Sequence, residues 1–327
     1  MVVKPVLRRY SGHLFRIVSS AILFYIALRQ VDWGSVHTVF RNIDPLWLLL
    51  HLLVLGFERL FYSYKWQILL TVKGVCVSLW KLLVITLIGK FWGTFLPSSI
   101  GVDIVRGYYL YRERANGAVI ASSLLFDKVM GLFSLLLLGT IGLLGYGTTI
   151  NEVNIGQVFI GLLVAVAAGI CLLQTRWLGD RLENGLPGFL GERVSGILIK
   201  VFRAFLAYRE SPAVVVYSFV LSILLQLIRI VGVYAMARAL DIDIPLVYYL
   251  VLVPLSMILI MLPLSVGGFG LREGVFIGLF ALAGMSKVDA FALGFATSLT
   301  DIILSLLGGV LYLAYRGGGK PAEKPGI

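Results

Sequence analysis

Long apolar stretches separated by short polar segments dominate the hydrophobic pattern of this chain. A helix needs about 20 apolar residues to cross a bilayer. Stretches of about that length occupy residues 13–30, 45–70, 118–145, 155–175, 213–238 and 291–315. A transmembrane barrel would instead show alternating apolar and polar positions. The pattern therefore predicts an all-α polytopic membrane protein with six spanning helices.

Two shorter apolar runs, 82–96 and 247–262, each stop at a proline. Each run is followed by a glycine-containing turn and then by a second helical stretch, 102–113 in one case and 270–284 in the other. Proline and glycine interrupt helices, and irregular backbone at membrane depth is tolerated only where protein or a water-filled cavity covers it. We therefore expect two re-entrant hairpins, each of which enters and leaves the bilayer on the same side.

The distribution of basic residues predicts the orientation of these helices. With a cytoplasmic N-terminus, the inner loops hold 16 Lys and Arg residues and the outer loops hold 4, as the positive-inside rule requires. The first hairpin then enters from the cytoplasm and the second from outside, which is the inverted-topology repeat of many secondary transporters. We expect a single multi-pass domain, residues 1–327, in the cell membrane, with both termini cytoplasmic. Repeat one covers about 13–145, repeat two covers about 155–315, and 316–327 form a disordered tail.

Composition supports a membrane protein and argues against several other classes. The chain is 59% apolar and 14% charged, whereas soluble domains contain about 45–50% apolar and about 25% charged residues. The basic loops account for the net charge of +11, so no nucleic-acid partner is expected. The two cysteines and three histidines show no metal-ligand spacing, so we expect neither a metal site nor a cofactor. We assign His37 and His51 to helix ends or interfaces.

Two polar motifs occupy the hairpin turns and match each other at an offset of 166 residues. They are FLPSSIGVDIVRG, residues 95–107, and MLPLSVGGFGLREG, residues 261–274. The aligned pairs include Pro97 and Pro263, Ser99 and Ser265, Gly101 and Gly267, and Arg106 and Arg272. The helix after each motif carries an acid near the membrane midplane, Asp127 in the first and Asp301 in the second. The match predicts two related hairpin tips that face each other inside the membrane.

The polar groups at these tips predict a site for an anion. A charge at the centre of a spanning helix costs about 2.5–3.5 kcal/mol, so these residues need partners or a wet cavity. The N-terminus of the helix after each turn favours an anion, and arginine binds phosphate through a planar fork of donors. The predicted substrate-binding residues are Arg106, Arg272, Ser99, Ser265, Gly101, Gly267, Gly268, Asp103 and Glu273. The predicted charge-balancing or coupling residues are Asp127, Asp301, Glu58 and Arg59.

Several of these residues have a purely structural alternative. Arg106 and Arg272 can form ion pairs with Asp103 and Glu273, or with the midplane acids. Asp127 can hold the helix bundle together through a salt bridge. The sequence leaves both interpretations open.

The remaining polar positions in the apolar segments receive weaker assignments. We expect Tyr62, Tyr64 and Trp66 to form an interfacial aromatic belt, and Lys128 to snorkel or to meet another helix. Residues 190–209 are amphipathic and predict a helix on the cytoplasmic membrane surface. No role is assigned to Lys90 or Arg229, which lack a repeat partner.

With these motifs the chain resembles the lysylphosphatidylglycerol synthase transmembrane region, also called the flippase-like UPF0104 family. The resemblance covers roughly residues 15–315 and is carried by GKFWGTFLPSSIGVDIVRG, LLFDKVMG and LPLSVGGFGLREG. The family usually has Gly-Gly-Asp in the first motif, whereas this chain has Val102 before Asp103. A side chain at Val102 is expected to limit close approach of the backbone at that tip. The soluble aminoacyl-transferase domain of some relatives is absent, so the resemblance implies membrane translocation and not lipid aminoacylation.

These features predict a lipid translocase, not an enzyme, that moves a phosphate-bearing head group across the bilayer. The head group belongs to a phospholipid or to a polyprenyl-phosphate-linked lipid. The expected partners are membrane lipids with anionic head groups, together with a second copy of the chain or a synthase. Two alternatives stay open: a membrane enzyme or accessory subunit of lipid-linked sugar or envelope-lipid synthesis, and an ion-coupled transporter of small solutes.

Overall fold

The computed structural model consists of packed α-helices, and in the part of the chain that it describes there is no β-strand. It describes residues 20–22, 24–96, 100–112, 116–146, 211–262, 264–265 and 267–318, with isolated positions at 160–161, 163–164, 168, 199, 203 and 206–208. The helices are α2 (Trp33–Arg41), α3 (Pro45–Thr71), α4 (Leu79–Phe95), α5 (Ile100–Tyr111), α6 (Gly117–Tyr146), α10 (Pro212–Ala239), α11 (Leu246–Ile260), α12 (Leu271–Phe280) and α13 (Lys287–Gly318), with a 3₁₀ turn at Ala281–Ala283.

Among the described residues, four helices are long and apolar enough to cross a membrane: Pro45–Thr71, Gly117–Leu143, Pro212–Ala239 and Lys287–Ala314. They coincide with four of the six predicted spans. A fifth prediction, 13–30, is described only from residue 20 onward and contains the apolar helix Ser20–Arg29. Most of 155–175 and of 190–209 lies outside the described residues, as does the predicted tail from residue 319 onward. The all-helical membrane class is confirmed, whereas the number of spans stays a prediction.

Both predicted hairpins contain the expected helix–break–helix arrangement. In the first, α4 ends at Phe95 and α5 begins at Ile100; in the second, α11 ends at Ile260 and α12 begins at Leu271. The two helices of each pair pack against each other. The breaks follow from the proline and glycine content of the motifs, since Gly267, Gly268 and Gly270 all have positive φ.

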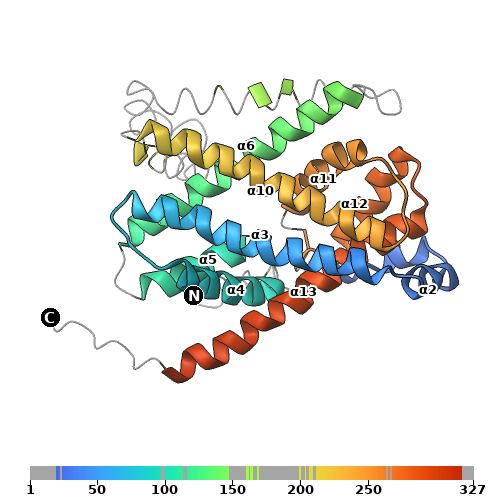
Figure 1. Cartoon of the computed structure of the whole chain (residues 1–327), viewed down its shortest axis with the longest axis horizontal. Coiled ribbons are helices and arrows are strands. Elements are labelled where there is room, and N and C mark those ends of the chain that lie inside the picture. Colours follow the sequence, from blue (N-terminus) through green and yellow to red (C-terminus); the bar gives the residue numbers. More distant parts are fainter. Residues whose placement is uncertain are drawn as a thin grey trace, which may run out of the picture.

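The two halves of the chain pack through corresponding contacts. The long helices α3 and α10 run side by side through the middle of the bundle (Figure 1). Around them, α4 packs on α13 and α11 packs on α6, so the first helix of each hairpin contacts the last long helix of the other half. The second hairpin helices contact the long helix that follows them, α5 on α6 and α12 on α13. The two halves of the chain therefore interlock, and neither half packs as a separate bundle.

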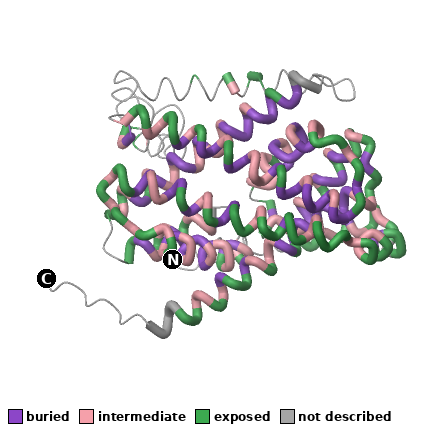
Figure 2. Tube along the Cα trace, viewed as in Figure 1, coloured by how far each residue is buried: buried purple, intermediate pink, exposed green. Residues whose placement is uncertain are grey.

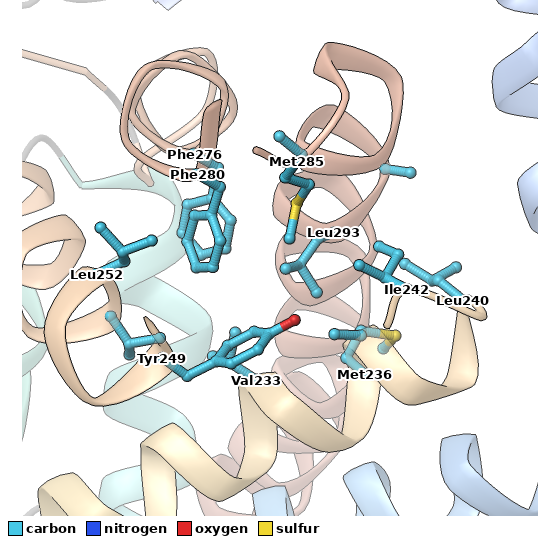
Figure 3. Close-up of a cluster of buried hydrophobic side chains, with 14 of the residues drawn as sticks. Val233, Met236, Leu240, Ile242, Tyr249, Leu252, Phe276, Phe280, Met285 and Leu293 are labelled. Atoms are coloured by element: carbon cyan, nitrogen blue, oxygen red, sulfur yellow. The ribbon is translucent and has the colours of Figure 1, made fainter. Parts of the chain in front are cut away.

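The largest apolar core lies where α10, α11, α12 and α13 meet. Val233, Tyr249, Leu252, Phe276 and Leu293 are buried there and point toward one another (Figure 3). The rings of Phe276 and Phe280 stack on the inner face of α12. The outward faces of the long helices instead carry exposed leucine, isoleucine and valine side chains (Figure 2), which is the distribution expected where lipid replaces water as solvent.

Glycines allow close helix approach at both crossings between the halves. A Cβ atom at Gly308 would lie 2.0 Å from the carbonyl oxygen of Leu87 on α4. At the corresponding crossing, a Cβ atom at Gly142 would lie 2.7 Å from a methyl group of Val251 on α11. Small residues at such contacts let backbones pack directly in membrane helices.

We expect Gly308→Ala to lower the free energy of unfolding by about 1–3 kcal/mol, because the new methyl group meets rigid backbone. Gly56→Ala is the matched control, since a Cβ atom there meets no atom within 4 Å and alanine favours the helix. Thermal unfolding in detergent measures both variants. Equal melting temperatures for Gly308→Ala and the wild type would contradict the close crossing.

Candidate functional site

Adjacent cavities that share charged lining residues lie in the middle of the bundle. The main cavity has a volume of about 260 Å³ and is bordered by residues of α3, α4, α6, α10, α11, α12 and α13. A second cavity of about 180 Å³ lies toward α5 and α6, and a small cavity of about 40 Å³ lies beside the turn before α12. Lys90 borders all three, and Arg229 borders the main and second cavities. The arrangement places one cation at the junction of the three spaces.

The main cavity carries an excess of positive charge. Four cationic side chains and two carboxylates border it, which gives a formal excess of +2 with His51 neutral. The cations are Arg59, Lys90, Arg229 and Arg272, and the carboxylates are Glu58 and Asp301. Because apolar walls surround these charges, their field acts at close range and at low dielectric. The cavity is therefore suited to an anion.

The two carboxylates hold three of the four cations in a fixed network. Glu58 accepts hydrogen bonds from Arg229, with the Glu58 Oε1 atom 2.8 Å from Nε and 2.7 Å from Nη2, and it also pairs with Arg59. Asp301 pairs with Arg59 and lies 3.6 Å from the Nη2 atom of Arg272. Glu58 and Arg59 are almost completely buried, whereas Arg229, Arg272 and Asp301 are partly open to the cavity. The network orients the partly open arginines toward the cavity space.

Lys90 differs from the other cations of the main cavity because its ammonium group has no hydrogen-bonding or ion-pair partner among the described residues. It is half-buried on the inner face of α4. A desolvated cation without a partner costs free energy, and ionisable residues inside a membrane helix commonly mark a substrate or ion path. An anion entering the cavity would find this ammonium group unoccupied.

The second cavity carries two separate ion pairs. The Nζ atom of Lys65 on α3 lies 2.8 Å from the Oδ1 atom of Asp127 on α6, and both side chains are buried. Lys128 on α6 lies 2.8 Å from Asp103 on α5, which confirms that Lys128 meets another helix. Each of these pairs joins two helices, which matches the structural interpretation of Asp127.

Two apolar grooves adjoin the cavities. One has a volume of about 590 Å³ between α3 and α10, is lined by apolar side chains only, and shares Val54 and Ile228 with the main cavity. The other, of about 500 Å³ between α5 and α6, shares Asp103 and Lys128 with the second cavity. Each groove brings hydrocarbon-like surface to the edge of a polar space.

Comparison with known proteins places this architecture in a family. A family model described as the lysylphosphatidylglycerol synthase TM region matches residues 14–309. The chain belongs to this family. It is also similar to two proteins named UPF0104 membrane protein from Methanothermobacter thermautotrophicus (strain Delta H). One is 22% identical over 91% of this chain and 91% of its own length, and the other is 23% identical over 87% and 89%.

In this member of the lysylphosphatidylglycerol synthase TM-region family, the two motif arginines occupy different environments. Arg272 borders the main and small cavities. Arg106 is fully buried and borders neither; its guanidinium carbon lies 4.3 Å from the ring centre of Tyr62 and 4.2 Å from that of Trp66. Its Nη1 atom lies 3.3 Å from Asp103. The interfacial belt is wrong for Trp66, which is fully buried and donates to Ser123.

Glu273 acts at a helix start and borders none of the cavities described above. Its carboxylate accepts from the backbone N–H of Gly270 at 2.8 Å and from the hydroxyl of Ser298 at 2.9 Å. These bonds close the first turn of α12 and join it to α13. Glu273 is fully buried, so the geometry gives it the task of positioning the segment that carries Arg272.

The remaining tip residues lie at or near the hairpin breaks. Gly267 borders the small cavity and has a φ of 60°, and a Cβ atom at this position would lie only 2.7 Å from the carbonyl oxygen of Thr94. Gly268 has a φ of 86°, and Gly101 packs against the side chain of Leu96. The Ser265 hydroxyl is buried without a hydrogen-bond partner among the described atoms. Ser99 lies outside the described residues, as do both motif prolines.

Val102 of the first motif fits against two glycines of α4. Cβ atoms at Gly89 and Gly93 would lie 3.5 Å and 2.4 Å from its methyl groups. The valine therefore fills the space that these glycines leave, and it also borders the second cavity. The close approach of α4 and α5 is achieved by glycine on α4 together with valine on α5.

The motif comparison missed three cations that the fold brings to the cavities: Lys65, Lys90 and Arg229. Each is a charged side chain within a largely apolar helix, and the free-energy cost of placing a charge inside the membrane was a usable signal. The repeat alignment did not find them because they have no counterpart at the matching offset.

Proposed function

We propose that this membrane protein is a lipid translocase that carries a phosphate-bearing head group through the main cavity. The observation that carries the proposal is a cavity with excess positive charge next to a wholly apolar groove. A lipid has this division: an anionic head that needs polar partners and tails that do not. Lys90, Arg229 and Arg272 would bind the phosphate, and the groove between α3 and α10 would hold a hydrocarbon tail.

The corresponding contacts of the two halves support an inverted repeat as the basis of transport. In this proposal the chain lies in the cell membrane with both termini cytoplasmic, and the two hairpins re-enter from opposite sides. Small rotations of α4 with α13 and of α11 with α6 would then open the cavity to one leaflet or the other. The protein acts on its lipid without changing it covalently, and the energy comes from an ion gradient or from the lipid gradient itself.

The test is transport in reconstituted liposomes, with either a fluorescent phosphatidylglycerol or a fluorescent polyprenyl phosphate as the probe. The wild type is expected to speed the exchange of at least one probe between leaflets. Arg272→Ala should slow that exchange about tenfold or more, because a hydrogen bond to a charged group contributes about 1.5–3 kcal/mol. Rates with the wild type equal to those of protein-free liposomes would overturn the proposal.

Arg106→Ala separates a positioning role from a binding role. Arg106 lies against two aromatic rings and borders none of the described cavities. Its loss should therefore lower the melting temperature clearly and change the affinity for lipid little. Arg272→Ala should weaken binding with little change in melting temperature.

Uptake of inorganic phosphate without lipid exchange would support the small-solute alternative, which the adjoining apolar groove disfavours.

A further inference from the structure

His51 is the one histidine among the described residues that borders the main cavity. It lies in the second turn of α3, as expected for a residue near a helix end, but its ring faces the bundle interior and is only 4% exposed. Its Nδ1 atom lies 2.8 Å from the carbonyl oxygen of Gly232 on α10, and its Nε2 atom lies 2.9 Å from the hydroxyl oxygen of Thr300 on α13. One imidazole ring thus connects three long helices at the wall of the cavity.

The partner of Nδ1 determines which nitrogen can gain or lose a proton. A backbone carbonyl only accepts hydrogen bonds, so Nδ1 carries a hydrogen whether the ring is neutral or charged. The variable proton is therefore on Nε2, which faces the hydroxyl group of Thr300. Histidine is the side chain that changes charge most readily near neutral pH.

Thr300 can satisfy Nε2 in both protonation states. Its hydroxyl oxygen lies 2.9 Å from the carbonyl oxygen of Ala296 and 3.2 Å from that of Thr297. When His51 is neutral, the hydroxyl donates to Nε2. When a proton from water binds Nε2, that nitrogen donates to the hydroxyl oxygen, and the hydroxyl hydrogen turns to the carbonyl of Ala296. The heavy atoms stay in place, so His51 can take up or release one proton without breaking the contact between α3 and α13.

The other charged groups around the cavity are less suited to this exchange. The charged groups that border the main cavity are Glu58 and Arg59 on α3, Lys90 on α4, Arg229 on α10, Arg272 on α12 and Asp301 on α13. Helix α6 adds no charge there, since it contributes only Leu135. Both carboxylates are engaged by guanidinium groups, and guanidinium groups do not release protons in proteins. Lys90 is the cation that we assign to the anion itself, and a bound anion keeps its ammonium group charged. His51 differs because Thr300 can satisfy its Nε2 atom in both protonation states.

We propose that His51 is a proton-binding site coupled to the anion site, so that an anionic lipid head group and a proton occupy the cavity together. The charged residues that border the cavity have an excess of positive charge, which opposes a charged imidazole. A bound anion reverses that effect, and by reciprocity a charged imidazole strengthens anion binding. The identity of the anion in this coupling rests on the proposed function. The coupling group is His51 and not Asp127 or Asp301, because each of these carboxylates forms an ion pair with a cation.

The test measures proton uptake when dihexanoyl phosphatidylglycerol binds the full-length protein in weakly buffered detergent. The phosphodiester of this probe keeps its charge between pH 5 and pH 9, so any proton taken up binds the protein. The wild type should take up as much as one proton for each probe molecule bound. Its affinity should fall by up to about tenfold per pH unit as the pH rises through the window of uptake.

Variants locate the proton on His51. His51→Gln should bind the probe with a flat pH dependence and without proton uptake. The matched control His37→Gln removes an exposed histidine on α2 and should behave as the wild type. Thr300→Val should reduce the uptake and Thr300→Ser should restore it, which keeps the proposal testable if His51→Gln does not fold.

Each outcome separates the coupling from the transport proposal. Probe binding by the wild type without proton uptake overturns the coupling alone, as does unchanged uptake in His51→Gln. Absence of probe binding by the wild type overturns the proposed function and the coupling with it.

Nitrogen-15 NMR of labelled histidine gives an independent check, since a neutral His51 with its hydrogen on Nε2 would contradict the hydrogen-bonding scheme.

Discussion

Lys90→Met should weaken binding of dihexanoyl phosphatidylglycerol about thirtyfold, because a hydrogen bond to a charged group contributes about 2 kcal/mol. The same substitution should leave the melting temperature of the lipid-free protein unchanged or raise it. Lys90 has no ion-pair partner among the described residues, so replacing it with an apolar side chain of similar length removes a desolvation cost and breaks no ion pair among them. Binding and stability are expected to change in opposite directions.

Calorimetry measures the binding, and thermal unfolding of the same sample measures the stability. Lys287→Met is the matched control, because Lys287 is exposed at the start of α13 and borders none of the cavities described above. A strong loss of stability in Lys90→Met, with binding unchanged, would show that the ammonium group is a structural ion-pair member and would remove it from the site.

Glu58→Gln should lower the free energy of unfolding by about 3–5 kcal/mol, the cost of breaking a buried ion pair from one side. Glu58 pairs with Arg59 and with Arg229, and its neutral replacement leaves Arg229 without a carboxylate partner among the ion pairs described. The size of the effect reflects an uncompensated charge, not the loss of one hydrogen bond. Reversible unfolding in mixed micelles measures it.

A second substitution tests that physical cause. The double variant Glu58→Gln with Arg229→Met should recover part of the lost stability, because it removes the stranded guanidinium group. The control is Asp243→Asn, which breaks the pair with Arg238 at 2.5 Å. Asp243 is 92% exposed, and exposed pairs contribute little. A double variant no more stable than Glu58→Gln would contradict the charge argument.

The broken hairpins were predictable from the chain because local chemistry decides them. A proline and several glycines stop an apolar run wherever it is placed in the fold, and α4 and α11 end within a few residues of the predicted positions. The cost of a charge in an apolar helix also predicted that charged residues there need partners or a wet cavity. The fold brings Glu58, Arg59 and Asp301 together, whereas Asp127 pairs separately with Lys65.

The different environments of Arg106 and Arg272 were not predictable in this way. The two residues match in the repeat, yet α3 presents the rings of Tyr62 and Trp66 to the first and the cavity lies beside the second. The structural alternative for Arg106, a pair with Asp103, is present. For Arg272 the partner is the midplane acid Asp301, and Glu273 is occupied by Gly270 and Ser298.

The amino-acid sequence by itself determined that this protein is a helical membrane protein with two interrupted hairpins and a costly set of intramembrane charges, because run length, helix breakers and desolvation are properties of single segments. Only the tertiary structure decided which charges neutralise one another, that Lys90 has no ion-pair partner among the described residues, and that His51 meets Gly232 and Thr300. Those pairings join residues far apart in the chain and depend on how each helix is rotated about its axis, which packing across both halves sets.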